Sequence, residues 1–183
     1  MDEYKISTIW FTGLSASGKT TLSQNLFTSL IDLGINNLVL LDGEAIRDQL
    51  QNYKFDSQSR EQVGIQKSKI ALEHNQKGKI VLISGIAHKK KWRSEIRDMF
   101  DNYFEIFLDC NVETCIIRDF KGNYKKAISG SINDFVGISE PYEASKGYDL
   151  MLDTSECSVE FCSQKILKEV LKHLKNNNLP CVE

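Results

Sequence analysis

The chain has 183 residues, the length of one compact domain. Hydrophobic residues make up 41% of it and charged residues 26%, so we expect a globular fold and not a disordered or fibrous chain. The formal net charge of −2 argues against a protein dedicated to nucleic acid, which usually carries a strong basic excess. No apolar run approaches the roughly 20 residues of a membrane span.

The first residues are acidic and show no signal-peptide pattern. The five cysteines form no CxxC pair, and no Cys/His cluster has zinc-ligand spacing. We therefore expect reduced thiols in a cytoplasmic protein.

Short apolar runs alternate with amphipathic segments along the chain. Such runs are typical of parallel strands that are buried on both faces of a sheet. The predicted strands are Ser7–Thr12, Asn37–Asp42, Lys79–Ser84, Tyr103–Cys110 and Leu150–Thr154. The predicted helices are Lys19–Leu33, Ser59–Gln76, Lys89–Phe100 and Val159–Leu174, with a short helix after the fourth strand. This alternation implies right-handed crossovers and a layered α/β sheet.

A phosphate-binding loop follows the first predicted strand. Residues 13–20 read Gly-Leu-Ser-Ala-Ser-Gly-Lys-Thr and match the pattern G-x-x-x-x-G-K-[ST]. The glycines allow a tight turn in which N–H groups point at phosphate oxygens, and the following helix adds its dipole. Lys19 can reach the β- and γ-phosphates, and the Thr20 hydroxyl can ligate Mg²⁺. We therefore expect a nucleoside triphosphate to bind here.

The loop also defines the fold class. We predict a three-layer, P-loop nucleoside-triphosphate hydrolase-like fold, with a mainly parallel sheet of about five strands and helices on both faces. Residues 1–183 are expected to form a single domain.

Two carboxylates follow the second predicted strand. Because ligands bind beyond the carboxyl ends of parallel strands, Asp42 should face the phosphate loop, with Glu44 close by. These residues can accept the proton of a hydroxyl group and ligate Mg²⁺, while Arg47 can hold an anion. A helix N-cap with an acidic first turn explains the same carboxylates, but the neighbouring loop favours the catalytic role. Which of the two is the base stays open.

Residues 118–143 carry few helical or strand signals. Long irregular segments in compact domains are often lids, so we predict a lid over about residues 119–143. Lys121, Lys125 and Lys126 would then close over phosphates. Periodicity alone favours a solvated basic surface instead.

Taken together, these motifs resemble the adenylyl-sulfate kinases. The resemblance rests on GLSASGKTT at 13–21, DGEAIR at 42–47, RDFKGNYKKA at 118–127 and FVGISEPYE at 135–143. It implies a kinase that uses ATP and Mg²⁺ to phosphorylate the ribose 3′-hydroxyl of a small-molecule nucleotide, with adenylyl sulfate as the first candidate. Family members commonly form dimers, so the resemblance also points to a homodimer.

The motifs and the resemblance together assign the site residues by role. The catalytic residues are Lys19, Asp42 and Glu44, and the Mg²⁺ ligands are Thr20 and Asp42. The ATP-binding residues are Gly13, Ser15, Ala16, Ser17, Gly18, Lys19, Thr20, Thr21 and Arg118. The acceptor-binding residues are Asp42, Arg47, Phe55, Arg60, Ile86, Ala87, Lys121 and Phe135. Arg118 would lie near the adenine of ATP, and the two phenylalanines would sandwich the acceptor's base.

The departures from the family pattern gather in the acceptor half. Ile65 and Gln66 stand where the family has arginines, Ala87 where it has a serine and Lys90 where it has an arginine. Lysine does not reproduce the bidentate anion binding of arginine. An alternative acceptor is therefore cytidine diphosphoramidate, the substrate of some relatives. Whether His88 and Lys90 contact the acceptor is left open.

Two other classes share a phosphate loop. A sugar or shikimate kinase would not need aromatic residues around a base. A GTP switch would need an Asn-Lys-x-Asp motif after a strand, and the sequence has none.

Overall fold

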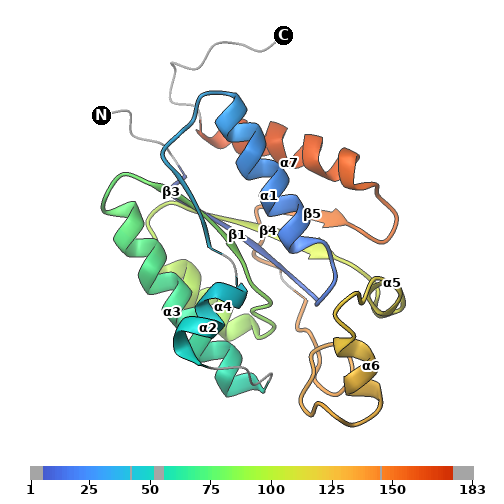
Figure 1. Cartoon of the computed structure of the whole chain (residues 1–183). Coiled ribbons are helices and arrows are strands. Elements are labelled where there is room, and N and C mark those ends of the chain that lie inside the picture. Colours follow the sequence, from blue (N-terminus) through green and yellow to red (C-terminus); the bar gives the residue numbers. More distant parts are fainter. Residues whose placement is uncertain (1–5, 42, 52–55, 145, 175–183) are drawn as a thin grey trace.

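Figure 1 shows the computed structural model of the chain, which describes residues 6–41, 43–51, 56–144 and 146–174. The strands are β1 (Thr8–Gly13), β2 (Leu38–Leu41), β3 (Ile80–Ser84), β4 (Tyr103–Asp109) and β5 (Leu150–Asp153). They form one sheet in the order β2-β3-β1-β4-β5, and every neighbouring pair is parallel. The predicted strands and the parallel sheet are confirmed, with small shifts at the strand ends.

Seven helices occur among the described residues. They are α1 (Lys19–Asp32), α2 (Gly43–Leu50), α3 (Ser57–Asn75), α4 (Lys90–Asp98), α5 (Val112–Ile117), α6 (Asn123–Ile128) and α7 (Val159–Leu174). Helix α3 begins two residues before the predicted start, because Asp56 caps it: the carboxylate accepts a hydrogen bond of 2.8 Å from the Ser59 N–H.

The helices cover both faces of the sheet, as predicted. Helices α1 and α7 lie on one face, and α2, α3 and α4 on the other (Figure 1). On the first face Leu26 and Leu30 of α1 and Ile166 of α7 pack on the inner strands. On the second face Trp10 and Ile83 of the sheet meet the helices. The central strands are thus buried on both sides, which explains their unbroken apolar runs.

The order of the strands places the ligand-binding edge. The chain leaves β1 for β2 and β3 on one side and later crosses to β4 and β5 on the other. Such a reversal opens a crevice at the carboxyl ends of the strands. The phosphate loop after β1 and the loop after β3 therefore meet at this edge, because Phe11 pairs with Ser84.

The segment predicted to be irregular contains helix α6, so that prediction is wrong for residues 123–128. The Asp119 carboxylate accepts hydrogen bonds from the N–H groups of Asn123 (3.0 Å) and Tyr124 (2.7 Å), which fixes the start of the helix. Tyr124 is fully buried against Leu14 and Phe135. The helix therefore depends on tertiary packing, which its sequence pattern does not reveal. None of the helices in the described parts of the chain is long and apolar enough to cross a membrane.

Asn75 fastens the end of α3 to the sheet. Its amide N–H₂ donates to the carbonyls of Ser7 (2.7 Å) and Lys79 (3.0 Å), and its carbonyl accepts from the Thr8 hydroxyl (2.8 Å). We expect Asn75→Ala to lower the free energy of unfolding by about 2 kcal/mol, because it leaves these groups without their partner. Urea denaturation measures the loss. Gln76→Ala, at the exposed next position, should change stability by less than about 0.5 kcal/mol; an equal loss there would contradict the assignment.

Candidate functional site

A cavity of about 830 Å³ lies at the carboxyl-terminal edge of the sheet. Its walls come from the phosphate loop, α1, α2, α3, the loop after β3, α4, the segment after α5 and the start of α7. It brings together most of the predicted site residues that the structure describes. These are Ser15, Ala16, Ser17, Gly18, Lys19, Thr20, Thr21, Arg47, Arg60, Ile86, Ala87, Arg118 and Lys121.

The phosphate loop holds its shape through its outward carbonyls. The Ser15 carbonyl accepts a hydrogen bond from the Tyr124 hydroxyl (3.1 Å), and the Ser17 carbonyl accepts one from the Thr154 hydroxyl (3.1 Å). Ala16 and Gly18 have φ values of 60° and 94°, in the left-handed region. With carbonyls satisfied on the outside, the loop N–H groups can face an anion in the cavity.

Gly13 opens the loop at a position that no side chain can occupy. Its φ is 146°, and an added Cβ would lie 2.4 Å from the carbonyl oxygen of Leu108 and 2.8 Å from the Ser17 hydroxyl. Gly13 does not line the cavity. Gly13 contributes to the site because its missing side chain lets the phosphate loop lie close against β4.

Lys19 begins α1 and lies half-buried at the base of the loop. Its ammonium donates to the Leu14 carbonyl and reaches the Ser17 hydroxyl at 3.5 Å. Burial lowers the pKa of Lys19 to about 7, and the nearby charges of Lys67 and Arg60 lower it further, while Cys115 opposes the shift. A phosphate group that binds beside Lys19 would raise this pKa again, because its negative charge favours the ammonium form.

Few candidate ligands for Mg²⁺ occur among the described residues of the cavity. Thr20 and Thr21 are exposed in the first turn of α1 and line the cavity. Among the described residues, no three His, Cys, Asp or Glu side chains cluster as a metal site. The exposed Thr20 hydroxyl at the cavity fits Mg²⁺ bound with a nucleotide, because that ion takes one or two protein ligands beside the phosphates.

The two predicted carboxylates cannot be placed in the same way. Asp42 lies outside the described residues, and so does Phe55; the side chain of Glu44 in α2 is not described either. Helix α2 begins at Gly43, which lines the cavity. The catalytic role and the N-cap role of these carboxylates therefore both stay predictions.

Basic side chains dominate the described cavity wall. They are Lys19, Arg47, Arg60, Lys67, Arg118 and Lys121, against the carboxylates Glu61, Glu95 and Asp119. Burial lowers the pKa of Arg60 to about 10, helped by the charge of Arg47; burial also lowers the pKa of Arg47. Burial disfavours the charge of these side chains, and a negatively charged ligand would stabilise it. The cavity should therefore attract a polyanion.

The loop after β3 is fixed by its backbone carbonyls. The Ile86 carbonyl accepts from the Thr12 hydroxyl (2.7 Å), and the Ala87 carbonyl accepts from Arg93 Nη1 (2.6 Å). Tyr142 completes this arrangement with a 2.8 Å hydrogen bond to the Thr12 hydroxyl. Ala87 has a φ of 37°, a strained conformation that these partners stabilise. Ile86 and Ala87 both line the cavity, and their predicted binding of the acceptor stays a prediction.

His88, the next residue, turns into the protein instead. Its side chain is fully buried, does not line the cavity, and packs edge-on against Trp92 at 5.0 Å between ring centroids. Its Nε2 lies 3.3 Å from the Ser57 hydroxyl. Lys90 is also absent from the described cavity wall, and its N–H donates to Glu143 Oε2 (2.7 Å). The described contacts of His88 are thus structural, and the contact of Lys90 is made by its backbone; whether the Lys90 side chain reaches the acceptor stays open.

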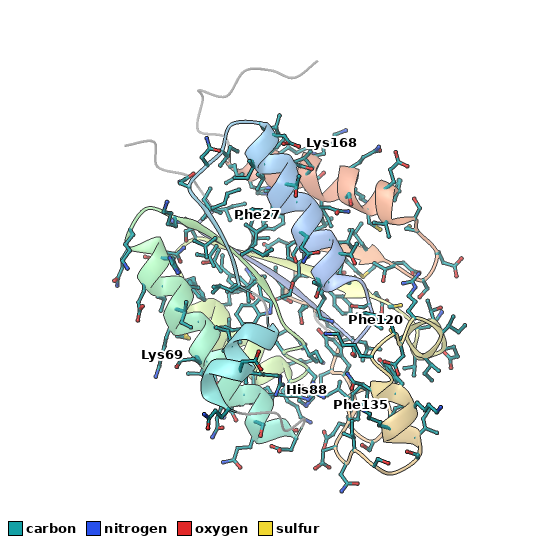
Figure 2. The ribbon with its side chains drawn as sticks, in the orientation of Figure 1. Phe27, Lys69, His88, Phe120, Phe135 and Lys168 are labelled. Carbon is teal, nitrogen blue, oxygen red and sulfur yellow. The ribbon has the colours of Figure 1, made fainter. Side chains whose placement is uncertain are left out.

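Phe135 is fully buried and does not line the described cavity. Its ring packs edge-on against Tyr124 at 4.9 Å and lies 5.7 Å from the Arg60 guanidinium. The aromatic sandwich therefore stays a prediction. Phe120 is 86% exposed and lies at the rim of the cavity, near the same edge of the sheet (Figure 2).

Several cavity residues were missed by the sequence reasoning. Trp10 lies in a strand that was predicted to be buried on both faces, and it is both buried and part of the cavity wall. Trp92 of α4 also lines the cavity. Lys67 was not singled out, although a signal existed: it follows Arg60 by seven residues and therefore lies on the same face of α3.

The chain is similar to kinases of one family. The family model for adenylylsulphate kinase matches residues 5–153. An adenylyl-sulfate kinase of Synechococcus sp. (strain JA-3-3Ab) is 35% identical over 167 residues, which cover 91% of this chain and 94% of that protein. A cytidine diphosphoramidate kinase of Campylobacter jejuni is 35% identical over 147 residues, which cover 80% of this chain and 85% of that protein.

A solved structure gives the same result. The APS kinase CysC of Mycobacterium tuberculosis, in complex with AMPPNP and APS, has a TM-score of 0.84 and 31% sequence identity to this chain. The match covers 93% of this chain and 99% of that one. The resemblance found in the sequence motifs is thereby confirmed.

The lowered pKa of Lys19 links nucleotide affinity to pH. A bound triphosphate favours the ammonium form, so binding takes up a proton above pH 7. The affinity for a non-hydrolysable Mg-ATP analogue should therefore fall as the pH rises from about 7.5 to about 9, by up to about tenfold per unit. Calorimetric titration measures this. Lys19→Arg, which stays protonated, should abolish the dependence; a flat wild-type profile would contradict the argument.

The buried imidazole of His88 should make the fold sensitive to acid. Burial lowers the pKa of His88 to about 4. The positive charges of Arg60 and Lys89 also lower it, whereas the carboxylates of Glu140 and Glu143 act in the opposite direction. The folded state therefore binds fewer protons than the unfolded state between pH 4 and 6.5, and stability is lost as the pH falls through that window. At about pH 5 the loss from this group should be about 2 kcal/mol.

The test compares urea denaturation of His88→Gln and the wild type at about pH 7 and about pH 5. The variant should lose less stability on acidification than the wild type. His74→Gln, near the end of α3, controls for removal of an imidazole. The same acid loss in His88→Gln as in the wild type would refute the assignment.

Proposed function

The chain belongs to the adenylylsulphate kinase family, and from this premise we propose that it is an ATP-dependent adenylyl-sulfate kinase. It transfers the γ-phosphoryl group of ATP to the ribose 3′-hydroxyl of adenylyl sulfate, which yields 3′-phosphoadenylyl sulfate and ADP. One observation carries the proposal: a single basic cavity joins the phosphate loop to Arg47, Arg60 and the loop after β3. Donor and acceptor can therefore meet within one enclosure.

The donor half binds ATP through the phosphate loop. Backbone N–H groups of the loop and the Lys19 ammonium would hold the β- and γ-phosphates, and Arg118, which also lines the cavity, would lie beside the adenine. The related CysC structure contains AMPPNP, an analogue of ATP, which supports ATP as the donor for this chain. The hydroxyl of Thr20, with Asp42, would hold Mg²⁺, and that ion when bound neutralises charge on the phosphate oxygens.

The acceptor half supplies a base and anion-binding groups. Asp42, with Glu44 beside it in the sequence, accepts the proton of the attacking 3′-hydroxyl, and ADP leaves with the electrons of the broken bond. Arg47, Arg60 and Lys121 hold the acceptor's anionic groups. Ile86 and Ala87 shape the wall, and Phe55 and Phe135 are proposed to stack on the base.

A second acceptor has a specific observation in its favour. The Campylobacter jejuni relative, named for cytidine diphosphoramidate, is as identical to this chain as the Synechococcus enzyme. In this chain Ile65 is 41% exposed and lines the cavity, which places an apolar group beside the acceptor's anions. The alternative is a 3′-hydroxyl kinase of that cytidine nucleotide on the same scaffold. The single domain, the lid at about 119–143, the homodimer and the cytoplasmic location stay predictions.

A coupled ADP-release assay with Mg-ATP tests the proposal. Adenylyl sulfate, cytidine diphosphoramidate and their parent mono- and diphosphates serve as acceptors, together with shikimate and gluconate. We expect turnover with adenylyl sulfate to exceed that with every other acceptor. Lys19→Ala and Asp42→Ala should each lower turnover by at least about 100-fold while the fold persists.

The other outcomes are equally decisive. Turnover of the cytidine nucleotide alone would overturn adenylyl sulfate as the substrate and retain the 3′-hydroxyl kinase. Phosphorylation of shikimate or gluconate above any nucleotide would refute the nucleotide acceptor altogether. Undiminished turnover in Asp42→Ala would remove its role as the base.

A further inference from the structure

The indole of Trp10 is a polar group in the cavity wall that the described residues leave without a hydrogen-bond acceptor. Its side chain is 1% exposed and lines the cavity. No described residue accepts a hydrogen bond from its Nε1–H. A buried indole N–H usually has a partner, because an unsatisfied buried donor destabilises the fold. A ligand bound in the cavity can supply that acceptor.

Gly85 shows which way the indole faces. A Cβ added to Gly85, directly after β3, would lie 3.0 Å from Trp10 Cζ2 and 3.4 Å from Trp10 Cε2. Nε1 is bonded to Cε2, so the ring edge that carries the N–H faces this glycine. Gly85 itself lines the cavity, next to Ile86 and Ala87. The polar edge of the indole therefore borders the cavity beside the proposed acceptor wall.

Gly64, in the interior of α3, leaves space between α3 and α4. Glycine is less favourable than alanine inside a helix, so helix propensity does not explain it. A Cβ added to Gly64 would lie 3.9 Å from Ile96 Cδ1 of α4, an ordinary contact distance. Close packing of the two helices therefore does not require glycine either. Because Gly64 lines the cavity, its missing side chain provides room for a ligand.

The space between these helices has mostly apolar walls. We call it the α3–α4 pocket, the part of the cavity lined by Trp10, Val63, Gly64, Trp92, Ile96 and Met99. Glu95 of α4 also lines the cavity, but its side chain is 55% exposed and its carboxylate lies 3.7 Å from Lys91 Nζ. A group that enters this pocket is therefore recognised by its size and by a hydrogen bond from Trp10.

The proposed binding mode leaves one part of the acceptor for the α3–α4 pocket. The 3′-hydroxyl must lie at the phosphate loop, the base is proposed to stack on Phe55 and Phe135, and Arg60 is proposed to hold the 5′ phosphate. Val63 and Gly64 follow Arg60 by about one helical turn, so they lie on the same side of α3. A group attached beyond the 5′ phosphate therefore reaches this pocket.

We propose that the α3–α4 pocket binds the terminal group on the acceptor's 5′ phosphate, and that Trp10 Nε1–H donates a hydrogen bond to an oxygen of that group. The ligand class is a nucleotide whose 5′ phosphate carries a second oxoacid group, either sulfate or phosphoramidate. This inference rests on the proposed kinase function and deepens it. Trp10 is then a specificity-determining residue that separates the acceptor from its parent monophosphate and takes no part in the transfer step.

The variants test the hydrogen bond and the space separately. Trp10→Phe removes the N–H and keeps an aromatic ring in the wall. Gly64→Ala and Gly64→Leu fill the pocket in two steps, and the alanine should raise the melting temperature, because it favours the helix. A loss of binding in Gly64→Ala therefore cannot come from unfolding. Lys69→Ala is the matched control, because Lys69 is exposed on the same helix (Figure 2).

The first measurement is calorimetric binding in the presence of Mg-ADP, which needs no transfer. It compares adenylyl sulfate with AMP, and cytidine diphosphoramidate with CMP. For the acceptor that the wild type binds more tightly, Trp10→Phe and Gly64→Leu should each weaken binding by about tenfold or more. Binding of the parent monophosphate should change by less than about twofold, and Lys69→Ala should change neither.

Three results of this measurement would overturn the proposal. They are equal losses for the acceptor and its monophosphate, no loss in either variant, and a wild type that binds both ligands equally well. The pair of ligands that responds also decides between sulfate and phosphoramidate as the terminal group.

The second measurement is turnover with the same acceptor. Trp10→Phe should raise KM by about tenfold and leave kcat within about twofold, because the terminal group is remote from the reacting hydroxyl. A lower kcat with an unchanged KM would refute the specificity role. If the wild type phosphorylates no acceptor, the proposed function fails, but the binding comparison still decides whether Trp10 recognises the terminal group.

Discussion

The parallel pairing of β1 with β3 is the constraint from which the rest of the site follows. Thr8 through Phe11 run in register with Val81 through Ser84, so β3 ends beside Phe11 and β1 ends two residues later, at Gly13, on the same edge of the sheet. The phosphate loop and the loop after β3 must then emerge side by side. A 2.9 Å hydrogen bond between the hydroxyls of Ser23 and Ser84 joins α1 to the end of β3 and fixes their separation. One register thus places donor and acceptor chemistry together.

Side chains remote from the cavity keep these two loops in shape. Arg93 donates both to the Ala87 carbonyl and to the Glu143 carbonyl, so it joins the loop after β3 to the segment that follows α6. Tyr142 does the same through Thr12 on β1. Each of these hydrogen bonds satisfies a backbone or hydroxyl group in the interior. The network therefore couples the acceptor wall to the segment predicted to be a lid, without contributing a reacting group.

The strands and the phosphate loop were predictable because local sequence determines them: apolar runs specify buried strands, and the glycine–lysine pattern specifies the loop. Helix α6 was not, because it depends on the Asp119 carboxylate and on burial of Tyr124. Lys67 was overlooked because a lysine in a polar helix usually faces solvent. Trp10 lies in a strand whose apolar run predicts burial, but a sequence cannot tell that a buried ring also borders a cavity.

The two halves of the cavity differ in what a substitution can change. The donor half is proposed to bind mainly through backbone N–H groups, whose directions depend on the left-handed residues Ala16 and Gly18 more than on side chains. The proposed acceptor half consists of side chains on α3 and of the loop after β3, where Ile65 and Ala87 depart from the family pattern. Exchanging such side chains alters the chemistry offered to the acceptor and leaves the sheet register intact. Divergence of acceptor specificity with conserved ATP use is therefore the change that this architecture most readily permits.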